Sequence, residues 1–138
     1  MAIVKAAVMV ARLSFRRMDR TFLLVGAFAG FLAVGIGAFG THTLRSRLSP
    51  EMLGAFETAV RYQMFHALAI VMVGLIVARL DGWLVRAAGW LFAVGIVLFS
   101  GSLYVLALSG VTILGAVTPI GGLAFLVGWA FLVVAAVL

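Results

Sequence analysis

Long apolar stretches separated by short polar connections make up most of the chain. They cover about residues 21–43, 62–78, 87–108 and 112–138. A helix needs roughly 20 mostly apolar residues to cross a hydrocarbon layer of about 30 Å. The pattern therefore predicts four transmembrane helices. The connections at 79–86 and 109–110 are so short that the helices they join must be antiparallel neighbours.

The longest polar connection, between the first and second spans, carries a helix start signal. Ser49 can cap a helix that begins at Pro50, and Glu51 then stands near the positive end of the helix dipole. Apolar residues follow on one helical face, at Met52, Leu53, Phe56 and Val60. We expect a short amphipathic helix over about 50–61 at the membrane surface, which either turns into the second span or continues as that span.

A basic arm, residues 1–20, precedes the first span. It carries five basic residues and one acid, namely Lys5, Arg12, Arg16, Arg17, Arg20 and Asp19. Two interpretations of this arm stay open. It forms a short basic helix on an anionic leaflet, or it is an extension that precedes a natural start at Met18.

The distribution of basic residues predicts the orientation of the spans. The arm carries five of them and the 79–86 connection two, against three at Arg45, Arg47 and Arg61 on the opposite side. Connections rich in Lys and Arg stay in the cytoplasm. We therefore expect both termini to be cytoplasmic, in the inner membrane of a bacterium.

Composition supports the membrane class and narrows the functions. The chain is 66% hydrophobic and 10% charged, which leaves too little polar surface for a soluble domain. Its net charge is +6, but the basic residues flank the spans rather than forming one continuous face. Membrane orientation explains that charge better than nucleic-acid binding does. Without cysteine, disulfides and thiolate metal sites are excluded.

Small residues mark a predicted contact between helices. In the first span they follow each other at steps of four and three, at Gly26, Gly30, Ala33, Gly37 and Gly40. Ala67 and Gly74 share a face of the second span, although the bulky Ile70 lies among them. Faces of small residues allow helix backbones to approach closely in lipid, so we expect both sets to serve helix packing.

Polar residues gather, on this topology, in the half of the spans opposite the termini. The set consists of His42, Tyr62, Gln63, His66, Ser100, Tyr104 and Thr118, below the helix that carries Glu57 and Arg61. Polar groups at membrane depth are costly and tend to be functional. Three interpretations stay open: a structural network in which these groups satisfy one another, a site for a small molecule, ion or proton, and a bound metal or haem.

His66 is the expected centre of any such site. Its helical phase places it beside the face of Gln63 and Ala67, and Tyr62 stands one turn before it, within hydrogen-bonding reach. His42 instead falls on the aromatic face of the first span, which argues against a haem held by both histidines. Glu57 and Arg61 are four residues apart in the order that favours an ion pair, and we expect them to form one.

Recognised catalytic and cofactor motifs are missing from the sequence. It contains no Walker loop and no dinucleotide fingerprint, and its four acids, Asp19, Glu51, Glu57 and Asp81, are scattered at span boundaries. We therefore expect a protein that is not an enzyme and that holds no cofactor and no metal.

Four segments together resemble a known family. They are GAFGTHTL (37–44), FETAVRYQMFHALAI (56–70), SGSLYVLALSG (100–110) and TPIGGLAFLVGW (118–129). In order and spacing they are similar to domain of unknown function family 423, the transmembrane protein 256-like proteins, from about residue 20 to the end. Thr41 and Thr43 stand where that family commonly has alanine. The resemblance implies a small multi-pass membrane protein and supplies no activity.

The expected function is that of a non-enzymatic accessory, assembly or structural partner in the membrane. Its surroundings would be the lipid bilayer together with a membrane-protein partner or a second copy of the chain. The alternative is a transporter or permeability factor that binds a small molecule, lipid or ion in a polar pocket of the outer leaflet.

Overall fold

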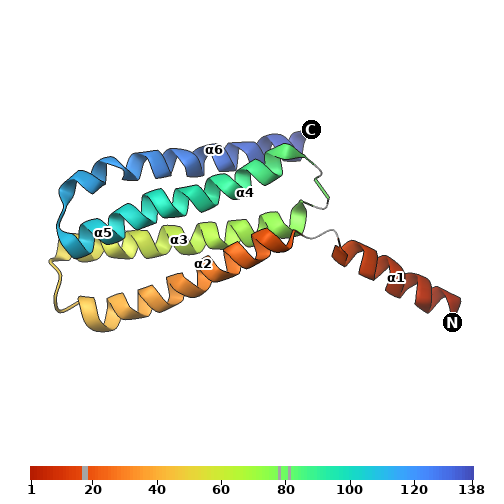
Figure 1. Ribbon diagram of the computed structural model, residues 1–138, viewed down its shortest axis with the longest axis horizontal. Helices are drawn as coiled ribbons and strands as arrows, with labels where there is room; N and C mark the ends of the chain where they lie inside the picture. The colour runs from red at the N-terminus through yellow and green to blue at the C-terminus, as the bar shows by residue number, and fades with distance from the viewer. Residues whose placement is uncertain (17–18, 78, 81) are drawn as a thin grey trace.

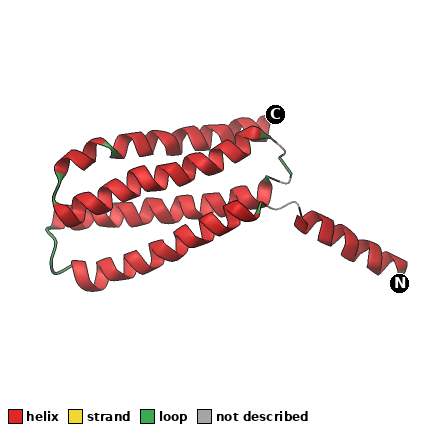
Figure 2. Cartoon of the chain, viewed as in Figure 1, coloured by secondary structure: helices red, strands yellow, loops and turns green. Residues whose placement is uncertain are grey.

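The fold consists of helices throughout the part of the chain that the structure describes. The computed structural model describes the backbone of residues 1–16, 19–77, 79–80 and 82–138, and the side chains of residues 1–9 and of the same ranges from 19 onward. Regular structure in these residues is entirely helical (Figure 2). Four helices are long and apolar enough to cross a membrane. The predicted all-α fold with four transmembrane spans is confirmed.

Two of the four spans contain a π-helical turn. The first span consists of α2 (Arg20–Phe39) and the π-turn η1 (Gly40–Leu44), and the second is α3 (Pro50–Ile76). The third consists of α4 (Trp83–Gly95), the π-turn η2 (Ile96–Ser100) and α5 (Gly101–Ser109). The fourth consists of the 3₁₀ turn η3 (Thr112–Ala116) and α6 (Thr118–Val137). Gly110, in the left-handed conformation with φ 72°, ends α5 and allows the tight turn that follows.

The predicted helix over residues 50–61 continues as the second span, the second of the two expected forms, because these residues form the first turns of α3. Ser49 accepts a hydrogen bond from the backbone N of Met52 at 3.3 Å, and Pro50 occupies the first turn, as the start signal predicted. Phe56 is only 2% exposed and Ala59 0%, so this part of α3 already packs within the bundle. Burial of these side chains keeps it in line with the rest of the helix.

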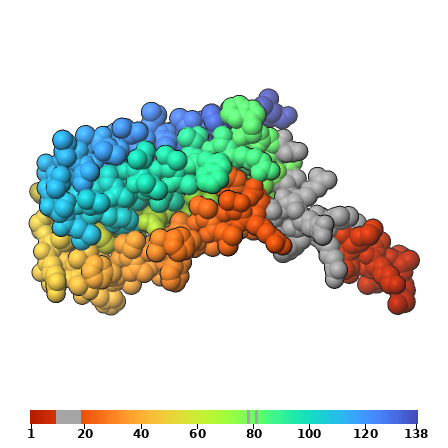
Figure 3. All heavy atoms as spheres, viewed as in Figure 1, coloured from red at the N-terminus to blue at the C-terminus, as the bar shows by residue number. Residues whose placement is uncertain are grey.

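The four spans form an antiparallel bundle with its two ends clearly distinct (Figure 1). At one end, here called the Asp19 end, α2 begins, α3 ends, α4 begins and α6 ends. At the other, called the Ser49 end, lie η1, the start of α3, the end of α5 and η3. The third span lies between α3 and α6, and α2 lies at the edge, against α3 (Figure 1). In the space-filling view α2 (orange) and the third span (green to cyan) form much of the visible face (Figure 3).

The helix α1 (Ala2–Arg16) is drawn apart from the bundle, at its Asp19 end (Figure 1). Side chains of residues 1–9 are exposed. The arginines at 12, 16 and 17 and the alternative start at Met18 lie outside the residues whose side chains are described. Both interpretations of the arm therefore stay predictions.

Small residues occupy the contact between α2 and α3. A Cβ added at Gly26 would lie 2.7 Å from the backbone N of Val71, and one added at Gly40 would lie 2.5 Å from the ring of Phe56. Gly30 and Gly37 face α3 as well, and Ala33 and Ala67 are each 1% exposed. Gly74 of α3 faces Leu23 of α2. The small faces of both helices thus meet, as close backbone approach in lipid requires.

The apolar core extends along α3, α4 and α6. Its largest cluster includes Phe22, Ile70, Val73, Val85, Phe92 and Phe125, and a smaller cluster at the Ser49 end contains Leu44, Phe56 and Ala107. His66 packs against Phe92 and Phe125 of the larger cluster, and Tyr104 packs against the smaller one.

Candidate functional site

Gln63 joins three of the four spans. It is 4% exposed on α3, and its side-chain amide donates to the carbonyl of Ala29 on α2 at 2.8 Å. Its amide oxygen accepts from the hydroxyl of Tyr104 on α5, also at 2.8 Å. The small residues of α2 bring its backbone within reach of the Gln63 side chain. The close contact between α2 and α3 and this hydrogen bond therefore depend on each other.

Serine hydroxyls tie the third span to its two neighbours. Ser100, at the end of the π-turn η2 and 0% exposed, donates to the carbonyl of Ala59 on α3 at 2.8 Å. Ser102 and Thr118 share a hydrogen bond of 2.8 Å between the third and fourth spans. Buried hydroxyls of this kind need such partners, because the bilayer offers no water to replace them.

His66 has both ring nitrogens occupied. It is 5% exposed, its Nδ1 lies 2.8 Å from the carbonyl oxygen of Tyr62, and the indole Nε1 of Trp129 on α6 donates to its Nε2 at 3.2 Å. A carbonyl can only accept, and an indole N–H can only donate. The network therefore assigns the proton to Nδ1 and describes a neutral imidazole.

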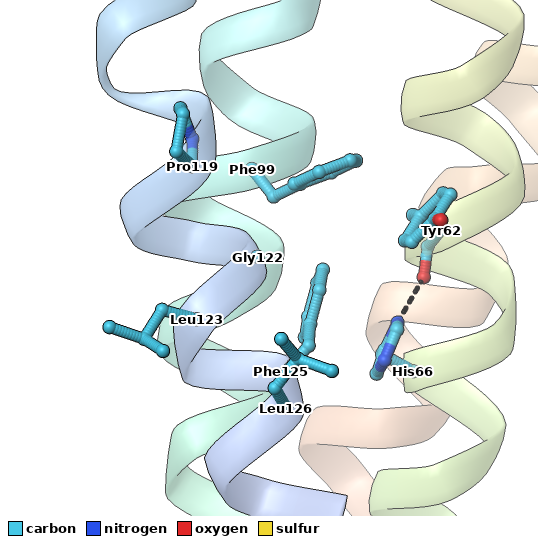
Figure 4. Close-up of a pocket in the computed structure, with 8 residues that line it drawn as sticks. All are labelled: Tyr62, His66, Phe99, Pro119, Gly122, Leu123, Phe125 and Leu126. Atoms are coloured by element: carbon cyan, nitrogen blue, oxygen red, sulfur yellow. Dashed lines mark hydrogen bonds between the residues drawn. The ribbon is translucent and has the colours of Figure 1, made fainter.

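The ring of His66 is also held by an aromatic side chain. Phe125 of α6 stacks on it with 3.5 Å between the ring centroids and an interplanar angle of 8°. Figure 4 shows Phe125 and His66 between α3 and α6, with the Tyr62 carbonyl above the imidazole. Rotation of the imidazole is thus restricted by one ring face and two hydrogen bonds.

The polar set extends along the bundle. α3 begins at Pro50 rather than near Tyr62, so His66 lies past the midpoint of the helix when counted from the Ser49 end. Thr118 begins α6, near that end. The polar residues therefore form a line from the Ser49 end to mid-bundle, and their placement in one leaflet stays a prediction.

Several expected contacts differ in detail. The hydrogen bond of His66 is made with the backbone carbonyl of Tyr62, whose own side chain is 40% exposed. His42 is exposed on η1, away from this network, as its helical phase predicted. The expected ion pair of Glu57 and Arg61 is wrong. Both side chains are exposed, and the ion pair that the described residues form is a different one.

One ion pair within 4.0 Å occurs in the part of the chain that the structure describes, between Asp19 and Arg86 at 2.6 Å. Asp19 also accepts from the backbone N of Thr21 at 3.0 Å, and its own N–H donates to the carbonyl of Gly74 at 3.0 Å. It caps α2 and ties its start to α3 and α4. This role was not predicted, although an acid directly before an apolar span is a helix-cap signal.

The role of Trp129 was not predicted either. Its signal was present, since an indole N–H inside an apolar span needs an acceptor. Among the described residues no group of three or more His, Cys, Asp or Glu side chains could hold a metal ion.

A groove of about 570 Å³ lies between α3 and α6 beside this network (Figure 4). Its walls are mostly apolar and include Tyr62, His66, Phe99, Leu123, Phe125 and Leu126. Leu123 and Leu126 are 60% and 68% exposed, so the groove opens on the surface that a bilayer would cover.

Residues 36–122, well over half of the chain, match the family model described as "Protein of unknown function (DUF423)". The chain belongs to the DUF423 family. The UPF0382 membrane protein YwdK of Bacillus subtilis is 47% identical over 119 residues, which are 86% of this chain and 97% of that relative. The UPF0382 membrane protein SERP0230 of Staphylococcus epidermidis is 48% identical over 97 residues, 70% of this chain and 79% of the relative. No solved structure gives a significant match.

Membership of DUF423 confirms the resemblance that the motifs indicated. Together with the four apolar helices, it describes a multi-pass membrane protein of a family whose function is unknown. The matched residues include Gln63, His66, Ser100 and Tyr104, so most of the network lies within the family segment.

Proposed function

We propose that this DUF423 protein is a non-enzymatic membrane component that acts by packing against another membrane protein or a second copy of itself. The observation that carries the proposal is the use made of the polar side chains. Gln63, Ser100 and His66 each form a hydrogen bond with a neighbouring helix. In the described residues, every buried side-chain nitrogen and oxygen has a partner within the chain.

These contacts suit a scaffold rather than a reaction centre. Hydrogen bonds between helices in a bilayer contribute about 0.6 kcal/mol each on average, so several together hold the spans in one register. A bundle fixed in this way presents a constant outer surface. Catalysis would instead require polar groups that are free to act on a substrate.

The surface most open to a partner is that of α2. The first span is the least buried of the four, because α2 lies at the edge of the bundle. Of its most apolar stretch of 18 residues, 17% is buried inside the protein. Phe28 and Phe31 project from it at 63% and 74% exposure. Rigid aromatic side chains of this kind suit helix contacts in lipid, since they lose little conformational entropy on packing.

Photo-crosslinking in cells tests this proposal. A photoreactive phenylalanine analogue at Phe31 is expected to give a discrete protein adduct larger than the chain, and its mass identifies a second copy or a partner. The same analogue at Leu123, 60% exposed on α6, is the matched control for the opposite side. Lipid adducts alone at both positions would contradict the proposal.

The groove beside His66 favours a second candidate function, the binding of an apolar molecule from the bilayer. Its volume of about 570 Å³ lies within the usual range of small-molecule sites, roughly 300–1,000 Å³. Leu123→Trp would fill the groove, and Leu24→Trp on the exposed side of α2 is its control. If a fluorescent fatty acid binds the purified protein and Leu123→Trp alone abolishes that binding, the groove is a ligand site. Equal signals from wild type and both variants exclude it.

The orientation that we propose has both termini in the cytoplasm of a bacterial cell. Support comes from the basic residues of the arm and from the position of both termini at the Asp19 end (Figure 1). The chain contains no cysteine, so a single introduced cysteine is the one site that a thiol reagent can label. We expect an impermeant thiol reagent to label Ser46→Cys in intact cells and Ala2→Cys only after permeabilisation. The opposite pattern would invert the orientation.

A further inference from the structure

A second groove, of about 350 Å³, lies where α2 passes into the π-turn η1 and packs against α3. Gly37, Gly40 and Thr41 form its wall on the first span. Phe56 and Val60 form its apolar floor on α3, and Glu57 and Arg61 carry opposite charges into it from the same helix. The glycines allow the first span to lie directly against Phe56 and Val60, because a Cβ at Gly40 would lie 2.5 Å from the Phe56 ring and one at Gly37 3.1 Å from Val60.

The position of these charges along α3 sets the depth of the groove. A helix of 27 residues is about 40 Å long, some 10 Å more than the hydrocarbon layer. Even if all of that excess projects at the Ser49 end, only about the first seven residues leave the hydrocarbon. Glu57 then stands at the boundary, and Arg61 lies one turn deeper.

Neither charge has a partner within the described chain. The ion pair between Asp19 and Arg86 belongs to the opposite end of the bundle. Glu57 and Arg61 are exposed, and no side-chain hydrogen bond joins either of them to another described residue. Charges at membrane depth are costly unless they find a partner. A ligand that supplies both a cation and an anion at this depth would satisfy the two together.

We propose that this groove binds a phospholipid whose headgroup carries a phosphate and a primary ammonium, as phosphatidylethanolamine does. The guanidinium of Arg61 offers the planar pair of donors that matches phosphate oxygens. The carboxylate of Glu57, one turn nearer the Ser49 end, accepts from the ammonium. The hydroxyl of Thr41 donates to the carbonyl of Gly37 at 3.1 Å, so its oxygen is available as a second acceptor.

The headgroup chemistry discriminates between lipids. A choline headgroup carries the same charges but has no N–H to donate, so it loses the hydrogen bonds to Glu57. A phosphatidylglycerol headgroup supplies the phosphate without the cation and leaves Glu57 unpartnered. The lipid is favoured over a soluble phosphoethanolamine because the floor of the groove is apolar and lies at the depth where headgroup and acyl chain meet.

Native mass spectrometry of the purified full-length protein tests the proposal. The protein is delipidated in mild detergent and offered equal amounts of dioleoyl phosphatidylethanolamine, its N-monomethyl and N,N-dimethyl derivatives, phosphatidylcholine and phosphatidylglycerol. We expect occupancy to fall at each added methyl group, with phosphatidylethanolamine at least fivefold above phosphatidylcholine. Equal occupancy across the series, or phosphatidylglycerol bound in preference, overturns the proposal. Displacement of the bound lipid by millimolar phosphoethanolamine overturns the choice of a lipid.

Two variants and two controls assign the site. Glu57→Gln is expected to abolish the preference for phosphatidylethanolamine over phosphatidylcholine, whereas Arg61→Gln lowers the occupancy of both. Glu51→Gln and Arg47→Gln make the same charge changes outside the groove and should leave the preference unchanged. If Glu57→Gln keeps the wild-type preference, the lipid binds elsewhere. Because the experiment uses the isolated chain, its outcome does not depend on the proposed association with a membrane partner.

Discussion

The indole Nε1 of Trp129 lies 3.2 Å from Nε2 of His66, although the two residues are 63 positions apart in the chain. This hydrogen bond joins α6 to α3, on either side of a groove that the ring of Phe125 partly fills (Figure 4). Because Nδ1 of His66 is held by the Tyr62 carbonyl, the acceptor at Nε2 is fixed in place for the indole. The fourth span is thus joined to the second by a donor and an acceptor that each find their partner across the groove.

Trp129→Phe should lower the free energy of unfolding by about 0.6 kcal/mol, and by no more than about 1.7 kcal/mol, the range found for hydrogen bonds between helices in lipid. His66→Ala should cost more, because it also removes the ring that stacks on Phe125. SDS titration of the protein in mixed micelles measures both values. Trp90→Phe is the control, since that indole is 53% exposed and donates to no described residue. Strict additivity of Trp129→Phe and His66→Ala in the double variant would show that the hydrogen bond contributes nothing.

Gln63→Leu should destabilise the bundle more than Tyr104→Phe does. The leucine removes the bonds to both Ala29 and Tyr104 and leaves the phenol unpaired, whereas Tyr104→Phe removes one bond. A buried polar group left without a partner costs about 1–3 kcal/mol. In a double variant, Tyr104→Phe should therefore recover part of the loss caused by Gln63→Leu. The same unfolding titration measures this recovery, and its absence would contradict the bond seen between the two side chains.

Gly26→Ala should separate α2 from α3. The added methyl group would lie 2.7 Å from the backbone of Val71, and a backbone atom cannot yield as a flexible side chain can. Such overpacking costs about 1–3 kcal/mol, which exceeds the gain of up to about 1 kcal/mol in helix propensity. Gly35→Ala on the same helix meets nothing within 4 Å and should be neutral or slightly stabilising. Thermal unfolding in detergent checks the pair, and equal effects at both positions would disprove the close contact at Gly26.

Asp19 should contribute to the free energy of unfolding through two separable roles, as a helix cap and as an ion-pair partner. Asp19→Ser keeps a capping oxygen but loses the contact with Arg86, whereas Asp19→Ala loses both. Loss of a cap costs about 0.5–2 kcal/mol. The pair itself is worth about 0–1 kcal/mol, because the Arg86 side chain is 54% exposed. Asp19→Ser and Arg86→Gln should thus lose the same free energy of unfolding in such titrations, and Asp19→Ala should be the least stable of the three variants. Equal losses for the serine and alanine variants would remove the capping role.

Properties that depend on neighbouring positions in the chain were predictable. The apolar runs predicted the spans, because the thickness of the bilayer fixes how many apolar residues a helix needs. Helical phase placed His66 inside and His42 outside, and the spacing of Gly26, Gly30 and Gly37 indicated the face that meets α3. Ser49 and Pro50 marked where α3 begins, and of the two continuations that the sequence left open, the structure has the unbroken helix to Ile76.

By itself, the sequence determined the membrane class, the four spans and the residues that turn inward, since periodicity and length are local properties. Only the tertiary structure decided which partners those residues find: Trp129 for His66, the Ala29 carbonyl for Gln63 and Arg86 for Asp19. It also decided that Glu57 and Arg61 face a groove rather than each other. Partner choice depends on how far each helix is rotated and shifted along its neighbours. Many weak apolar contacts set that geometry together, and the sequence of a single span does not contain it.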